Sequence, residues 1–285
     1  MNLKSNYADS LITLTTKHSK SDAIAPIFNK IHKADVKEYH FDTDTLGTFS
    51  GEIQRTGSIL DCAKKKCQLG IKFTQSLHGL ASEGSFGPHP FVPFIPCNYE
   101  ILYFIDNKLD FHLDVSFFTE KTNFSTSLIS SYTQLKNFAK TVKFPSHSLI
   151  LRPDNRHSLN PIFKGIQTFI YLKFAYDECI KSAKDKTVFV ETDMRANQNP
   201  TRMDSITQLA KSLAIRLDTL CPKCMCPGWG KVNIEQGLPC VACKIPSDVI
   251  KFDVFGCPKC VHKEKRLPSH GLTETPQENC KYCNP

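Results

Sequence analysis

Long apolar segments are missing from this chain of 285 residues. No stretch approaches the ~20 consecutive apolar residues that span a bilayer. The first ten residues contain neither an apolar region nor the small-residue cleavage site of a secretory signal. Internal repeats and low-complexity runs are also lacking. We therefore expect a cytoplasmic protein that does not bind membranes, in a reducing compartment where disulfides are disfavoured.

The composition is that of a globular protein, with 40% hydrophobic and 22% charged residues. The length allows one large or two modest domains. Lys and Arg number 36 against 28 Asp and Glu, a formal charge of +8. Taken alone, this excess suggests a nucleic-acid partner.

The cysteines are distributed unevenly. Nine of the 13 lie between positions 221 and 283, and the other four are scattered over the first 220 residues. The tail also lacks any long periodic apolar segment, as expected of a module that is closed by metal and not by a hydrophobic core. We therefore predict a domain over residues 1–220 and a zinc-binding module over 221–285.

Eight of these nine cysteines form four Cys-x-x-Cys pairs. The pairs are Cys221/Cys224, Cys240/Cys243, Cys257/Cys260 and Cys280/Cys283. The 15, 13 and 19 residues between successive pairs are typical of structural zinc sites. Eight thiolates fill two tetrahedral sites and leave no open coordination position, which predicts two structural zinc ions. Iron–sulfur ligation is the alternative.

The spacing does not decide which pairs share an ion. Consecutive pairing, first with second and third with fourth, is the simplest arrangement. Nested and interleaved arrangements remain open. The ninth cysteine, Cys226, is interpreted as a packed thiol, and His262 and His270 as surface residues.

The first 220 residues alternate strand and helix patterns. The expected strands are 11–15, 36–41, 79–82, 100–105, 111–117, 148–151 and 187–190. The expected helices are 22–31, 58–74, 125–142, 161–182 and 200–220. These patterns predict a mixed-sheet α/β domain, followed by a C-terminal module that resembles a double zinc ribbon.

Four segments are too polar and rich in turn residues for a core. They are 42–55, 81–90, 144–147 and 191–203, and three of them follow expected strands. In open α/β sheets, ligands bind beyond the carboxyl ends of strands. These segments are therefore expected to form a ligand site.

The side chains of these segments suit phosphate chemistry. Carboxylates for a Mg²⁺ ion come from Asp42, Asp44, Glu52, Glu83 and Asp193. Bidentate contacts to an anion come from Arg55, Arg195 and Arg202, with Lys17 as a further candidate. His89 lies between two prolines, where it could act as an acid or base. The alternative interpretation is that the acids cap turns and pair with the arginines.

Several longer motifs resemble a bacterial family that carries only a domain-of-unknown-function label. The motifs lie at 46–52, 81–90, 192–195, 199–203, 226–230 and 283–285. The resemblance covers nearly the whole chain and implies no activity. Met225 and Lys244 stand where a zinc knuckle usually has glycine after its second cysteine.

A weaker likeness in the order of elements is to nucleotide pyrophosphatases of the inosine-triphosphatase type. This likeness implies that Glu83 binds metal or activates water and that Lys17 and Arg202 contact phosphate. Only one carboxylate stands in the segment 81–84, and those enzymes have no counterpart of the zinc tail.

We predict that the chain binds a phosphorylated small molecule or nucleotide. If the chain is an enzyme, we expect it to hydrolyse this ligand with Mg²⁺. The alternatives are a zinc module that binds nucleic acid or protein, or two zinc clamps on a domain with another ligand. Each four-thiolate zinc site has a net charge of −2, so two sites lower the tail from +3 to −1 and the chain from +8 to +4. This correction favours a small anion over a polyanion. The oligomeric state is left open.

Overall fold

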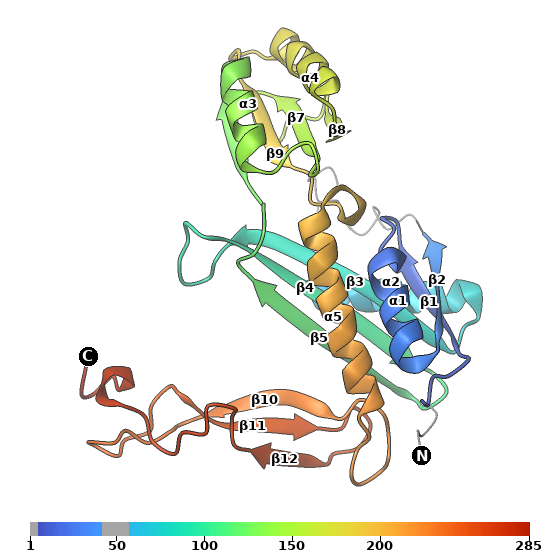
Figure 1. Cartoon of the computed structure of the whole chain (residues 1–285), viewed down its shortest axis with the longest axis vertical. Helices are drawn as coiled ribbons and strands as arrows, with labels where there is room; N and C mark the ends of the chain where they lie inside the picture. The colour runs from blue at the N-terminus through green and yellow to red at the C-terminus, as the bar shows by residue number, and fades with distance from the viewer. Residues whose placement is uncertain (1–4, 42–56) are drawn as a thin grey trace. The chain divides into compact units, whose positions relative to one another are not determined.

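The computed structural model describes residues 5–41 and 57–285. The chain divides into two compact units. Unit 1 comprises the chain up to Lys108 together with Asp114–Ala214, and unit 2 comprises Leu109–Leu113 together with Ile215–Pro285. Figure 1 shows the elements of both units. In the part of the chain that is described, no helix has the length and apolar character to cross a membrane.

The first sheet is mixed, with the strand order β2-β1-β3-β4-β5. Its strands are β1 (Leu11–Thr16), β2 (Asp35–His40), β3 (His78–Pro88), β4 (Pro96–Asp106) and β5 (Phe111–Thr119). The strand β1 runs parallel to β2 and β3, and β4 pairs antiparallel to β3. Parallel and antiparallel pairs in one sheet with flanking helices confirm the predicted mixed α/β class.

Helices cover both faces of this sheet. The helix α2 (Ile59–Thr74) packs Ala63 and Cys67 against Ala81 and Ile101 of the sheet. The helices α1 (Ser21–His32) and α5 (Pro200–Asp218) meet where His32 Nε2 lies 2.9 Å from the carbonyl oxygen of Ala214. In Figure 1, α1 and α5 lie on the opposite face from α2.

The second sheet is antiparallel, in the order β6-β9-β7-β8. Its strands are β6 (Thr126–Ile129), β7 (Leu149–Pro153), β8 (Phe163–Ile166) and β9 (Val188–Thr192). The helices α3 (Tyr132–Thr141) and α4 (Phe169–Ser182) cover it, and the short helix η2 (Ala196–Gln198) precedes α5. Leu135, Leu149, Leu172 and Val190 are fully buried in its core.

Two predicted helices, 125–142 and 161–182, begin later than expected. In each case a short strand comes first, β6 or β8, and a capping side chain then starts the helix. Ser131 Oγ accepts from the backbone N–H of Gln134 at 3.3 Å, and Thr168 Oγ1 accepts from that of Tyr171 at 3.2 Å. These hydroxyls satisfy backbone donors at the helix start, which fixes the boundary.

The expected strand 79–82 is much longer in the structure. β3 continues to Pro88 and pairs residue by residue with β4, so that Glu83 lies opposite Ile101 and Gly84 opposite Glu100. The polar segment 81–90 is therefore mostly strand and not a loop. The sequence did not indicate this strand, because polar and glycine residues are rare in strands. Pairing with β4 along the whole hairpin stabilises it.

The tail contains a small antiparallel sheet, β10-β11-β12. Its elements are β10 (Gly230–Gln236), β11 (Ile250–Gly256), β12 (Lys263–Arg266) and the short helix η3 (Gln277–Asn279). The Cys-x-x-Cys turns lie outside these strands: one before β10, one between β10 and β11, one between β11 and β12, and one after β12.

Candidate functional site

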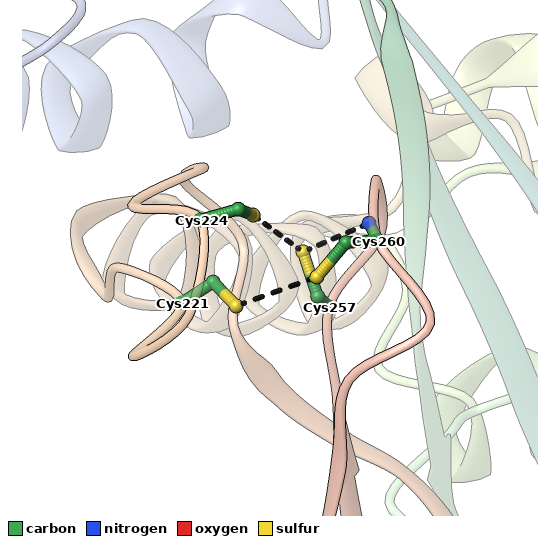
Figure 2. A group of neighbouring side chains, drawn as sticks. All are labelled: Cys221, Cys224, Cys257 and Cys260. Carbon is green, nitrogen blue, oxygen red and sulfur yellow. Dashed lines mark hydrogen bonds between the residues drawn. The ribbon is translucent and has the colours of Figure 1, made fainter.

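The eight paired cysteines converge into two groups of four. One group contains Cys221, Cys224, Cys257 and Cys260, and the other contains Cys240, Cys243, Cys280 and Cys283. Within each group the sulfur atoms all lie within 4.8 Å of one another. Figure 2 shows the first group, in which the cysteines of two separate turns face each other.

The grouping is interleaved. The first pair joins the third and the second joins the fourth, in place of the consecutive arrangement that is simplest from the spacing. The spacing could not reveal this, because each turn presents two thiols and any two turns can complete a tetrahedron. The strands β10, β11 and β12 connect the turns, and their arrangement in the sheet decides which two turns come together.

The two groups have the dimensions of zinc sites. A Zn–S bond of about 2.3 Å in a tetrahedron places sulfur atoms about 3.8 Å apart. The Sγ atoms of Cys221 and Cys260 are 3.8 Å apart, and those of Cys224 and Cys257 are 3.6 Å apart. In the second group, the corresponding distances are 3.9 and 3.6 Å. The donor set and its geometry therefore fit two structural zinc ions.

The first two turns share one backbone conformation. Met225 and Lys244, each directly after the second cysteine, have φ angles of +58° and +61°. Their N–H groups donate to the carbonyls of Cys221 and Cys240 at 2.9 Å. The left-handed conformation explains why glycine is usual here, and the two turns adopt it with larger residues.

Unit 1 contains a group of five charged side chains that are almost completely removed from solvent. We call them the charged cluster: Lys20, Lys66, Glu83, Glu100 and Arg202. None of these side chains is more than 12% exposed. Burial of a charge is costly unless it is paired, so the partners of each group decide its role.

The charged cluster is divided between the two faces of the first sheet. Successive residues of β3 point to opposite faces. Glu83 contacts Lys66 of α2 on one face. Gly84 and Glu100, which are opposite each other in register, belong to the other face, where Arg202 of α5 binds Glu100.

Lys20 and Arg202 are held by short contacts on this second face. Arg202 Nε donates to Glu100 Oε1 at 2.7 Å, and Lys20 Nζ donates to the Oγ and carbonyl oxygen of Ser82 at 2.8 and 2.9 Å. A Cβ atom on Gly84 would lie 2.4 Å from Glu100 Oε1 and 2.6 Å from Arg202 Nη2. A side chain at position 84 would therefore displace the paired ends of Glu100 and Arg202.

Among the described residues, the charges of this cluster do not balance. Lys20, Lys66 and Arg202 are three cations. They face two carboxylates, those of Glu83 and Glu100. Burial, and next the positive charge of Arg202, lowers the pKa of Lys20 from 10.5 to about 7. Lys20 can therefore gain or lose its proton near neutral pH.

A sequence profile of one protein family matches residues 66–285, more than half of the chain. The chain belongs to the family described as domain of unknown function DUF6671. No curated protein matches the sequence. The match to the family includes all eight paired cysteines and four members of the charged cluster, and Lys20 lies before it.

The structure separates most of the residues that the sequence predicted for one site. Asp42, Asp44, Glu52 and Arg55 lie outside the described residues. Lys17 is exposed, three residues before the buried Lys20. Among residues 5–41 and 57–285, the two cysteine groups are the only sets of three or more potential metal ligands that converge.

Asp193 and Arg195 form a pair with each other. Arg195 Nη2 donates to Asp193 Oδ2 at 2.6 Å, and Arg195 Nε donates to Oδ1 at 3.0 Å. Asp193 also accepts from the backbone N–H of Gly165. The alternative interpretation of the sequence, in which arginines pair with acids, describes these two residues.

His89 belongs to the loop between β3 and β4. Its Nδ1 accepts from the backbone N–H groups of Phe91 and Val92 at 3.1 and 3.2 Å. It lies six residues beyond Glu83, a distance of roughly 20 Å along an extended chain. His89 therefore shapes the hairpin loop and does not join the charged cluster.

Sequence reasoning missed Lys20, Lys66 and Glu100. Glu100 was placed in a strand, but its burial against a residue 102 positions away has no local signal. Lys20 follows the first strand and directly precedes α1. This position could have marked it as a ligand candidate in place of Lys17.

Proposed function

We propose that the chain binds a small phosphorylated ligand at the charged cluster, and that two structural zinc ions fold its tail. The observation that supports ligand binding is the surplus cation of the charged cluster. Lys20, Lys66 and Arg202 lie there with two carboxylates, those of Glu83 and Glu100. A phosphate group would supply the missing negative charge.

The energetics favour an anion at this position. Burial, and next the positive charge of Arg202, lowers the pKa of Lys20 to about 7, even though Glu83 and Glu100 act in the opposite direction. An anion that reaches Lys20 restores its charge and gains a strong charge-assisted hydrogen bond. Arg202 lies in the first turn of α5, where the helix dipole also favours negative charge.

Binding is proposed without a Mg²⁺-dependent step. Glu83 contacts Lys66 and Glu100 contacts Arg202, so these carboxylates balance cations. The proposal therefore concerns binding, which the titration below measures.

The tail is a weaker candidate for polyanion binding. Several of its basic residues pair with acids on the β10-β11-β12 sheet, as in Lys231 with Asp253 and Arg266 with Glu264. Two zinc sites would leave the tail with a charge of −1. We therefore place the ligand in unit 1.

Calorimetric titration with inorganic phosphate, pyrophosphate, ribose 5-phosphate and nucleoside phosphates tests the proposal. We expect at least one to bind, and Lys20→Met to weaken that binding by about tenfold or more, because a hydrogen bond to a charged group is lost. Lys17→Met is the matched control, since Lys17 is exposed in the same loop. Binding that is unchanged in Lys20→Met, or no binding by any phosphate compound, would overturn the proposal.

A further inference from the structure

A pocket of about 450 Å³ adjoins the charged cluster. Its lining includes Gly84 and Phe86 of β3, Phe124, Ile150 of β7, Glu191 of β9, and Met194. This volume is within the range of small-molecule sites. Gly84 also contacts two members of the charged cluster, because a Cβ built there would meet Glu100 and Arg202.

The floor of the pocket is a row of side chains across the second sheet. Thr126 and Ile150 are the register partners of Glu191 on either side of it, in β6 and β7. Register partners in antiparallel strands project their side chains from the same face. The row therefore presents one carboxylate between a hydroxyl and an aliphatic side chain.

One wall is aromatic and leads towards the cluster. The rings of Phe86 and Phe124 are 6.1 Å apart and tilted by 34°. Arg202 Cζ lies 5.1 Å from the centre of the Phe86 ring. A ligand whose ring packs against these phenylalanines thus has the guanidinium of the charged cluster close by.

Glu191 gives this pocket a specific acceptor. Arg152 contacts its Oε1, so a ligand donor would bond to Oε2. Burial raises the pKa of Glu191 despite the nearby Arg152. Water is therefore partly excluded from this carboxylate, and a hydrogen bond from a ligand to it is stronger than the same bond in water.

We infer that this pocket holds a nucleobase. The inference rests on the proposed function and makes the ligand a nucleotide, with its phosphate at Lys20 and its base between the phenylalanine wall and Glu191. A planar heterocycle matches the two requirements of the pocket, an aromatic face for stacking and an N–H donor for a carboxylate.

The test compares the four common nucleoside 5′-monophosphates with ribose 5-phosphate, which lacks the base. We expect the best nucleotide to bind at least about tenfold more tightly than ribose 5-phosphate, from stacking and one hydrogen bond. Thr126→Trp should remove this advantage by filling the pocket. Thr126 is exposed and lies on the edge strand β6, so a larger side chain is compatible with folding.

Leu128→Trp is the matched control. Leu128 is exposed on the same strand, two residues further on, and does not line the pocket. We expect it to leave both ligands unaffected, and we expect Thr126→Trp to leave ribose 5-phosphate unaffected.

The two proposals fail in different ways. Ribose 5-phosphate that binds as tightly as every nucleotide, or a nucleotide advantage that survives Thr126→Trp, overturns the nucleobase inference and leaves the anion site standing. If Lys20→Met binds nucleotides and ribose 5-phosphate as tightly as the unmodified protein does, the anion site is overturned. An advantage lost equally in Leu128→Trp also overturns the pocket assignment.

Discussion

At the scale of single residues, the burial of Lys20 makes the stability of unit 1 depend on pH. Its pKa is about 7 in the folded chain and 10.5 when it is free in water. Between these values the unfolded chain binds more protons than the folded one. The free energy of unfolding contributed by Lys20 therefore rises as the pH rises from about 7 towards 10.

The Lys20→Met variant lacks this titration. We expect the unmodified protein to gain about 2 kcal/mol of stability relative to the variant between about pH 7.5 and 9.5, because one proton is released on folding. Urea unfolding at the two pH values measures the difference. Lys17→Met should behave as the unmodified protein does. Identical pH dependence in all three proteins would show that Lys20 is charged in the folded state or not buried.

The candidate residues show what a sequence reveals about a site. Glu83 and Arg202 were chosen because polar residues near strand ends and helix starts are unusual, and both are buried. Their partners were not predictable, since Arg202 meets Glu100 across 102 positions of sequence. Asp193 and Arg195 were predicted to contact ligand, but being two residues apart they could satisfy each other.

At the scale of elements, local patterns located all five helices but missed the short strands β6 and β8. Apolar periodicity located α5 within two residues of its observed end at Asp218. The strand β3 was truncated in the prediction because its second half contains Glu83, Gly84 and Gly87, which are poor strand formers. Its pairing with β4 over the whole length overrides that local preference, and pairing with a distant strand is not a local signal.

The interleaved arrangement of the cysteine turns predicts how zinc content responds to combined substitutions. Replacing the first and third pairs, Cys221, Cys224, Cys257 and Cys260, by serine should remove one ion and leave the second site complete. Replacing the first and second pairs should remove both, because each site loses two ligands. Elemental analysis of the purified variants gives the zinc content per chain.

Consecutive pairing predicts the opposite ranking. In that arrangement the first substitution set would abolish both sites, and the second set would leave one zinc ion. The two variants carry the same number of serines, so each is the control for the other.

At the scale of the whole molecule, unit 2 includes a short segment from the α/β region of the chain. Leu109–Leu113, at the turn between β4 and β5, group with the tail and not with the rest of their sheet. Lys259 Nζ donates to the carbonyl of Leu109, and a Cβ on Gly228 would lie 2.5 Å from Leu113 Cδ2. We therefore expect the metal sites to stabilise residues 109–113 as well as the tail that contains the cysteines.

Zinc removal by a chelator tests whether the metal sites stabilise residues 109–113. We expect backbone amides of unit 2, including residues 109–113, to lose protection from hydrogen exchange, because structural zinc supplies folding energy. The strands β7 and β9 of unit 1 should stay protected. Mass spectrometry of peptides measures both regions, and added zinc should restore the signal. Protection at 109–113 that persists without zinc would show that the tail is independent of this hairpin.

The interleaved cysteines also have a consequence for biosynthesis. A growing chain emerges from its N-terminal side, so Cys221, Cys224, Cys240 and Cys243 leave the ribosome before Cys257 does. These four thiols have the spacing of a complete zinc site, and an ion captured at this moment would be held by turns that belong to different sites in the finished protein. The mature tail must then form by ligand exchange, in which the early ion is passed to later cysteines.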